Sequence, residues 1–219
     1  MDLTIKICGL KEEGTIVTAV EQGADYIGLV FFDKSPRNVS IARARELRQF
    51  VGQQAKVVAV TVDPTDAILL QIVSEVKPDF LQLHGNESLA RVNEIKARFA
   101  LPIIKACPIR DSGDIEAALS YQPHVESLLF DAKPLEHAAL PGGNGIVFDW
   151  SLLAPLKGKV DYILSGGLNA ANIAKALDIT NAKTIDVSSG VEISPGIKDK
   201  NLIEKFFAAV HEIGAKERK

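Results

Sequence analysis

Two short apolar runs, each followed by a glycine turn, constrain the fold of this chain more than any other feature. Tyr162–Leu164 precedes the turn Ser-Gly-Gly at 165–167, and Thr184–Val187 precedes Ser-Ser-Gly at 188–190. A helical pattern lies between them, with Asn169 as its expected N-cap. Because glycine lets a ligand approach the backbone closely, the turns present N–H groups suited to a phosphate at neighbouring strand ends. The pattern predicts the last two units of a barrel of alternating strands and helices.

Six more strand–helix units precede this stretch, which makes eight in total. Each expected strand is a short apolar run, mostly rich in β-branched residues, and helical spacing fills nearly every gap. Strict alternation requires parallel strands, so we expect an α/β fold, a (β/α)8 TIM barrel, in one domain covering residues 1–219. A doubly wound open sheet is the alternative, but no G-x-G-x-x-G follows the first strand. The expected strands begin at Thr4, Tyr26, Lys56, Phe80, Ile103, Ser127, Tyr162 and Thr184.

Local signals also predict where several helices begin and end. Ser40, Ser112 and Asp149 are residue types that cap helix N-termini. Pro64 suits the first turn of a helix, because its missing N–H has no partner there. The last expected helix is amphipathic and covers residues 201–213.

Length and charge narrow the classes of protein further. The 219 residues fit a compact barrel, since such barrels need about 200 to 250. The net charge of −3 gives no electrostatic reason for a nucleic-acid or anionic-membrane partner. No signal peptide and no apolar run of about 20 residues is present. Two cysteines do not make a disulfide framework, so we expect a soluble, cytoplasmic protein.

Cys8 and Asp131 lie where expected strands end, the edge at which barrel enzymes carry their catalytic groups. Cys8 is either a small buried core residue or a partly ionised thiol that acts as base or nucleophile. Asp131 follows the apolar run 128–130, and an acid there is either functional or hydrogen-bonded to a loop. Position alone leaves both alternatives open for each residue.

Four other strand-end or loop residues are candidates for the site. Arg37 follows the second strand and is either solvated or binds a carboxylate bidentately. His84 is a structural histidine or a participant, and Asp186 points into the barrel mouth or forms a structural salt bridge. Cys107 is expected to pack, and the glycine turn at 142–145 could form a third side of the phosphate site. No C-x-x-C or H-x-x-x-H spacing occurs among these residues, so we expect no metal site.

Seven motifs, in order from the first expected strand to the last, resemble those of the phosphoribosylanthranilate isomerase family. Two departures keep the same backbone role: Asn144 stands where the family often has threonine, and Ala132 where serine commonly follows the acid. The motifs are Lys6–Leu10 (KICGL), Ser35–Arg37 (SPR), Gln82–Gly85 (QLHG), Phe130-Asp131 (FD), Gly142–Gly145 (GGNG) before Phe148–Trp150 (FDW), Leu164–Leu168 (LSGGL) and Asp186–Glu192 (DVSSGVE).

The resemblance covers the whole chain and implies a single-domain (β/α)8 barrel and an isomerase of tryptophan biosynthesis. The implied reaction is the Amadori rearrangement of N-(5-phosphoribosyl)anthranilate to 1-(2-carboxyphenylamino)-1-deoxyribulose 5-phosphate. The family needs neither a metal nor an organic cofactor. The expected partner is therefore a small phosphosugar, and we expect a monomer, with a homodimer as the alternative.

The resemblance also implies a role for each site residue. Asp131 is the general acid, Cys8 is the general base, and Arg37 binds the anthranilate carboxylate. His84 and Asp186 support the substrate. The phosphate is held by Gly143, Asn144, Gly145, Gly166, Gly167, Ser189 and Gly190.

Two alternatives remain from the sequence. Another phosphosugar aminoaldose–ketose isomerase barrel, of histidine biosynthesis, performs the same rearrangement, but it uses two aspartates where this chain has Cys8 and Asp131. A non-catalytic phosphosugar-binding barrel would keep the glycine turns, but it would have no reason to keep an acid and a thiol at strand ends.

Overall fold

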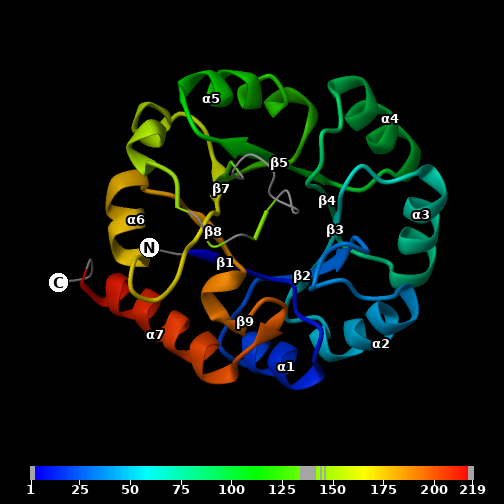
Figure 1. The fold of residues 1–219 in the computed structure, drawn as a ribbon, viewed down its shortest axis with the longest axis horizontal. Helices are drawn as coiled ribbons and strands as arrows, with labels where there is room; N and C mark the ends of the chain where they lie inside the picture. Colours follow the sequence, from blue (N-terminus) through cyan, green and yellow to red (C-terminus); the bar gives the residue numbers. More distant parts are fainter. Residues whose placement is uncertain (1–2, 134–141, 144, 146, 217–219) are drawn as a thin grey trace.

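The computed structural model describes residues 3–133, 142, 143, 145 and 147–216, and it shows a closed barrel of eight parallel strands. Pairing between β1 (Thr4–Cys8) and β8 (Thr184–Val187) closes the barrel. The helices surround the strands on the outside (Figure 1). The (β/α)8 barrel predicted from the sequence is therefore confirmed.

Each barrel strand begins at the residue that the sequence predicts, but two strands end later than expected. The sequence predicts the fifth strand at residues 103–106 and the sixth at 127–130, whereas the fifth reaches Ile109 and the sixth reaches Ala132. Cys107 and Asp131 therefore lie within strands and not after them. The strands between β1 and β8 are β2 (Tyr26–Phe31), β3 (Lys56–Thr61), β4 (Phe80–Leu83), β5 (Ile103–Ile109), β6 (Ser127–Ala132) and β7 (Tyr162–Leu164).

The helices fill the gaps between strands, as the periodicity predicts. None of the helices in the described part of the chain is long and apolar enough to cross a membrane. They are α1 (Glu13–Glu21), α2 (Ile41–Val51), α3 (Asp66–Gln71) continuing as η1 (Ile72–Val76), α4 (Leu89–Phe99), α5 (Ser112–Leu119), η2 (Gln122–His124), η3 (Trp150–Leu156), α6 (Ile173–Thr180), η4 (Ser189–Val191) and α7 (Lys200–Lys216), with a small hairpin of β9 (Glu192–Ser194) and β10 (Ile197–Lys198) after η4.

Two of the expected helix caps are confirmed, and two are not. Ser40 accepts a hydrogen bond from the N–H of Arg43 at the start of α2, and Asp149 caps η3. Ser112 is already the first residue of α5, and the cap is Asp111. Asn169 does not cap α6, because its Oδ1 accepts from the N–H of Ala171 in the turn before that helix.

Two other helix boundaries also differ from the sequence expectations. Pro64 precedes α3, whose cap is Thr65. The last helix is α7, which is longer than the expected range 201–213.

The strands place alternate side chains inside the barrel and between the barrel and the helices. The inner apolar cluster holds side chains from several strands, and the larger outer cluster packs the helices onto the sheet. Polar residues continue the inner rows toward the carboxyl ends of the strands: Asp131 follows Leu129 by two positions, and Ser165 follows Ile163 in the same way. The inner apolar side chains are those of Cys8, Val30, Val58, Val60, Ile104, Ala106, Leu129 and Ile163.

Candidate active site

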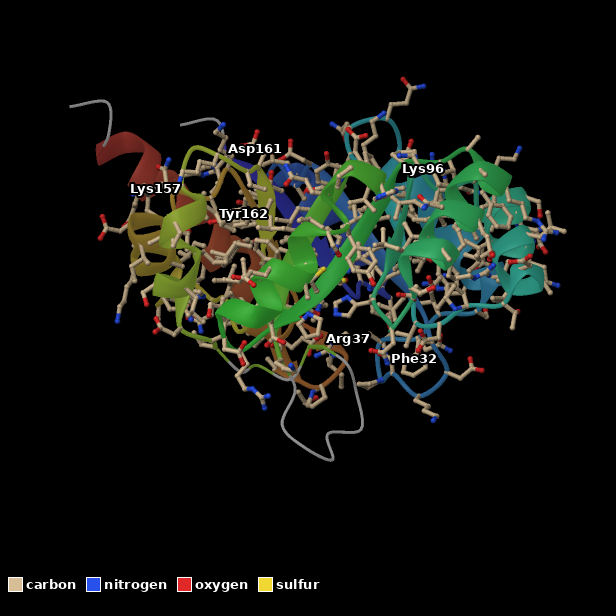
Figure 2. The ribbon with its side chains drawn as sticks, turned by 90° about the horizontal axis from the view of Figure 1, so that it is seen from above. Phe32, Arg37, Lys96, Lys157, Asp161 and Tyr162 are labelled. Carbon is tan, nitrogen blue, oxygen red and sulfur yellow. The ribbon has the colours of Figure 1, made fainter. Side chains whose placement is uncertain are left out.

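A pocket opens at the carboxyl ends of the barrel strands, at the edge where Figure 2 shows Arg37 and Phe32. Asp161 and Lys157, which precede β7, lie at the opposite edge. The pocket brings together most of the residues that the sequence singles out. Its lining includes Cys8, Arg37, His84, Asp131, Gly143, Gly145, Gly166, Gly167, Asp186 and Ser189.

Cys8 lies at the end of β1 beside a buried ion pair. The Nζ atom of Lys6 is 2.8 Å from Oδ1 of Asp186, and both residues are buried. Gly28 on β2 faces Cys8 and makes room for these groups, because a Cβ there would lie 2.9 Å from Sγ of Cys8 and 3.2 Å from Nζ of Lys6. Asp186 thus both faces the barrel mouth and forms a salt bridge.

The electrostatics around Cys8 differ from the partly ionised thiol that the sequence suggests. Burial raises the pKa of the Cys8 thiol above its ordinary value, because the low-dielectric interior disfavours a thiolate. The charge of Lys6 acts in the opposite direction, since it favours the thiolate. Lys6 is the main group that favours the thiolate, and Lys198 acts in the same direction, but burial still keeps the pKa of Cys8 above its ordinary value.

Asp131 lies on β6, across the barrel mouth from β1. Its Oδ1 accepts a hydrogen bond of 2.8 Å from the N–H of Ala132. Its Oδ2 is 3.3 Å from Nε2 of His84, whose Nδ1 is 2.8 Å from the side-chain nitrogen of Gln82. The backbone of Gly142 lies against both the imidazole and the carboxylate. The acid expected from the sequence is thus held through its two oxygens.

Arg37 is buried, unlike a solvated loop arginine. Its Nε and Nη2 atoms each lie 2.8 Å from an oxygen of Glu192, and Nη2 also donates to the carbonyl of Gly143 at 3.0 Å. Lys198 contacts the same carboxylate at 2.6 Å. Although burial alone would raise the pKa of Glu192, Arg37 and Lys198 lower it to about 2. The carboxylate that holds Arg37 is therefore ionised at neutral pH.

The glycine turns lie around one part of the pocket. Gly166 has a φ of +90°, a conformation that favours glycine. A Cβ there would also lie 2.8 Å from the backbone nitrogen of Ala132, so the turn packs tightly against β6. Gly190 is not part of the pocket lining and instead packs against the backbone of Leu168. Asn144, the remaining predicted phosphate residue, lies outside the described residues.

Four polar residues of the site received no role from the sequence: Lys6, Gln82, Glu192 and Lys198. Three of them lie within the family motifs, which was the only signal available. Lys198, which ends the short strand β10, lies outside every motif, and an isolated lysine gives no such signal. Within the described residues, no group of three or more His, Cys, Asp or Glu side chains could hold a metal ion. Cys107 faces the outer apolar cluster, as expected of a packing residue.

Known proteins are similar to this chain over nearly its whole length. Residues 5–209 match the family model described as N-(5'phosphoribosyl)anthranilate (PRA) isomerase. Proteins named N-(5'-phosphoribosyl)anthranilate isomerase from Chelativorans sp. (strain BNC1) and Brucella canis are each 53% identical, over 96% and 98% of this chain and 96% and 97% of theirs.

Solved structures agree with the sequence comparisons. The crystal structure of phosphoribosyl anthranilate isomerase from Thermotoga maritima has a TM-score of 0.86 and 34% identity, covering 96% of this chain and 99% of that one. A phosphoribosyl anthranilate isomerase in complex with reduced 1-(o-carboxyphenylamino)-1-deoxyribulose 5-phosphate has a TM-score of 0.83 and 33% identity, with the same coverage. The fold, the ordered motifs and these relatives together place the chain in the phosphoribosylanthranilate isomerase family.

Proposed function

We propose that this chain converts N-(5-phosphoribosyl)anthranilate to 1-(2-carboxyphenylamino)-1-deoxyribulose 5-phosphate in tryptophan biosynthesis, with Asp131 as general acid and Cys8 as general base. The observation that carries this assignment is the pocket itself. It holds a carboxyl group on β6 and a thiol on β1, with glycine turns and an arginine in the same lining. An acid and a base on different strands can act on one substrate from two sides.

Asp131 opens the ring in this mechanism. Its carboxylic acid gives a proton to the furanose oxygen, the bond between that oxygen and C1 breaks, and the anilino nitrogen forms an iminium with C1. The carboxylate that remains accepts a hydrogen bond from the N–H of Ala132, and its Oδ2 lies 3.3 Å from the ring donor Nε2 of His84. These donors stabilise the charge that develops on Asp131 during the transfer.

Cys8 then removes the proton from C2, which the neighbouring iminium has made acidic. The electron pair of that C–H bond neutralises the iminium and gives an enolamine, which becomes the ketone by gaining a proton at C1 and losing the hydroxyl proton at C2. The base must be a thiolate, and Lys6 beside it favours that form. The buried Lys6–Asp186 pair places this positive charge without exposing it to solvent.

Arg37 and the glycine turns hold the two charged ends of the substrate. Glu192 takes up Nε and Nη2 of Arg37, while Nη1 has no hydrogen-bond partner among the residues described. We assign Nη1 to the anthranilate carboxylate. We assign the phosphate to Gly143, Gly145, Gly166, Gly167 and Ser189, which line the pocket, and, from the family resemblance alone, to Asn144; Gly190 supports the turn through its contact with Leu168.

The same assignment extends to partners and location. The ligand is a small phosphosugar, and the net charge of −3 supports neither a nucleic-acid nor a membrane partner. We propose that the protein is a monomer. We also propose that it acts in the cytoplasm, because a phosphorylated substrate does not cross a lipid bilayer unaided. A Thermotoga maritima structure described as monomers of a dimeric phosphoribosylanthranilate isomerase keeps the homodimer as the alternative.

The test is turnover of a fluorescent anthranilate derivative. A separate transferase makes the substrate in place from anthranilate and phosphoribosyl pyrophosphate, and the decay of its fluorescence is followed. We expect rapid decay with the wild type, and a loss of about 10² to 10⁴-fold with Asp131→Asn. Asp161→Asn is the matched control, because Asp161 is exposed at the opposite edge of the barrel (Figure 2). A folded wild type without turnover would contradict the assigned substrate, and the protein would then be a phosphosugar-binding barrel.

A further inference from the structure

We infer that Gln82, a residue beneath the pocket, positions the acid Asp131 by holding the proton of His84 on Nε2. The inference rests on the proposed function for the role of Asp131. Gln82 does not line the pocket and is fully buried, so it is a positioning residue and not a catalytic one.

The geometry defines a chain of three side chains. The amide nitrogen of Gln82 is 2.8 Å from Nδ1 of His84, and Nε2 of His84 is 3.3 Å from Oδ2 of Asp131. An amide N–H can only donate, so Nδ1 must accept and therefore carries no proton. In a neutral imidazole the proton then lies on Nε2, the ring nitrogen that is 3.3 Å from the carboxylate.

The surroundings of Gln82 leave His84 as its polar partner. In the barrel register, Gln82 lies between Val60 on β3 and Ile104 on β5, and both neighbours are apolar and buried. Side chains two positions apart on a strand share a face. His84 directly follows β4 and keeps this alternation, because its N–H still donates to the carbonyl of Thr61 on β3. Gln82 and His84 therefore both point into the barrel. The direction of Gln82 is thus given by the strand, and the imidazole above it completes the contact.

Packing alone does not explain a glutamine at this position. Its Oε1 is buried and has no hydrogen-bond partner within the described part of the chain. A buried acceptor without a partner lowers stability, whereas methionine has a similar length and no such acceptor. The amide therefore lowers the stability of the fold relative to methionine. Its contact with His84 is the feature of glutamine that methionine cannot provide.

The proton position matters to Asp131 because of the charge left after ring opening. When Asp131 has given its proton to the substrate, Oδ1 accepts from the N–H of Ala132, and Oδ2 lies 3.3 Å from Nε2 of His84, close enough to be attracted by an N–H there. If the proton of His84 were on Nδ1, the lone pair of Nε2 would face that of Oδ2 and repel it. Without the amide of Gln82, the imidazole exchanges between its two neutral forms. A smaller fraction of the molecules then carries the proton on Nε2, the form that favours the Asp131 carboxylate.

The test compares Gln82→Met with Gln71→Met, a control at the exposed end of α3. In the ¹⁵N-labelled protein, two-bond ¹H–¹⁵N correlation spectra show which ring nitrogen of each histidine carries the proton, and His84→Asn identifies the signals of His84. We expect the Nε2–H form in the wild type and the control, and a mixture of both forms in Gln82→Met. The single-turnover rate should fall about ten-fold, with KM unchanged and a melting temperature that is equal or higher.

Three results would overturn the inference. His84 could carry its proton on Nδ1 in the wild type, which would mean that Oε1 and not the amide nitrogen faces the ring. Gln82→Met could leave both the proton position and the rate unchanged. It could also lower the melting temperature without affecting either, which would make Gln82 a structural residue only. If the wild type itself shows no turnover, the proposed function fails, while the spectra still decide whether Gln82 controls His84.

Discussion

Cys8 and Cys107 end the same three-residue pattern, a lysine, an apolar residue and a cysteine, on β1 and on β5. Both thiols are buried, but Cys8 lines the pocket while Cys107 packs between the barrel and its helices. Side chains alternate between the two faces of a strand, so the phase of the pattern decides its surroundings. On β1 the lysine and cysteine face inward, and on β5 they face outward.

The two lysines of the pattern each form a buried ion pair with a carboxylate, but their other neighbours differ. Lys105 contacts the carboxylate of Glu87 at 3.1 Å, and it also donates to the carbonyls of Gly85 at 2.8 Å and Ala106 at 2.9 Å. Lys6 contacts the carboxylate of Asp186 at 2.8 Å and also interacts with the thiol of Cys8. An ammonium surrounded by carbonyls ties strands together, whereas one with fewer partners can still act on a neighbouring thiol.

The largest expected difference between the two cysteines is in turnover. Cys8→Ala should lower it by about 10² to 10⁴-fold, because the base that takes the C2 proton is lost. Cys107→Ala should leave it unchanged, since Cys107 faces away from the pocket. The fluorescence assay measures both variants directly. Equal losses would mean that burial and not chemistry explains the effect at Cys8.

Replacing each lysine by methionine separates stability from chemistry. Both Lys6→Met and Lys105→Met leave a buried carboxylate without its cation, which should lower the free energy of unfolding by about 3–5 kcal/mol. Only Lys6→Met should also raise the pKa of Cys8 beyond the effect of burial, since Lys6 opposes that shift. The rising limb of its pH–rate profile should therefore move to higher pH.

Urea unfolding and pH–rate profiles measure these two effects separately. The double variant with Lys6→Met and Asp186→Asn removes both charges and is the control, which should regain stability but not rate. If the two single variants shifted the rate profile equally, the proposed distinction between the two ion pairs would be wrong.

Gly28→Ala should displace the thiol of Cys8 and lower turnover less than Cys8→Ala does. The added methyl group would lie 2.9 Å from Sγ of Cys8 and 3.2 Å from Nζ of Lys6. Crowding of this kind destabilises a core by about 1–3 kcal/mol, and we expect turnover to fall about ten-fold. Gly113→Ala, in α5, is a control outside the pocket. Unchanged kinetics in Gly28→Ala would show that the site tolerates a displacement of the thiol.

The smallest expected effect is on the pH dependence of stability, and it comes from Cys107. Burial raises the pKa of its thiol from 9.0 to about 11. Between these values the unfolded chain releases the proton and the folded chain keeps it, so stability is full below pH 9 and falls as the pH rises toward 11. From pH 8 to pH 10 the wild type should lose about 1 kcal/mol more than Cys107→Ala. An equal loss in both proteins would show that Cys107 is not the group responsible.

Much of the fold was predictable because its signals are local. All eight strands begin where short apolar runs begin, and a run of a few residues is enough to reveal each one. Helix starts were less predictable, because neighbouring polar residues compete for one capping position. Asp111 and Ser112 are adjacent and both suit a cap, and the backbone geometry decided for Asp111.

The candidate site was predictable as a set of residues but not as a set of contacts. The ordered motifs led to Cys8, Arg37 and Asp131, all of which line one pocket. Sequence alone did not reveal that Arg37 would be buried against Glu192, since an arginine in a polar loop is usually solvated. It also assigned no role to Gln82, because nothing local distinguishes an amide that faces a histidine from one that faces solvent.

The amino-acid sequence by itself determined the alternation of strands and helices and the family motifs, since both depend on residues that are close in the chain. Only the tertiary structure decided which residues meet. Closure of the barrel brings Lys6 to Asp186 across 180 positions and Arg37 to Glu192 across 155. It also decided that one lysine–cysteine pattern faces the pocket and the other the helices. The physical reason is that burial and ion pairing depend on neighbours in space, which strand pairing supplies and local propensity does not.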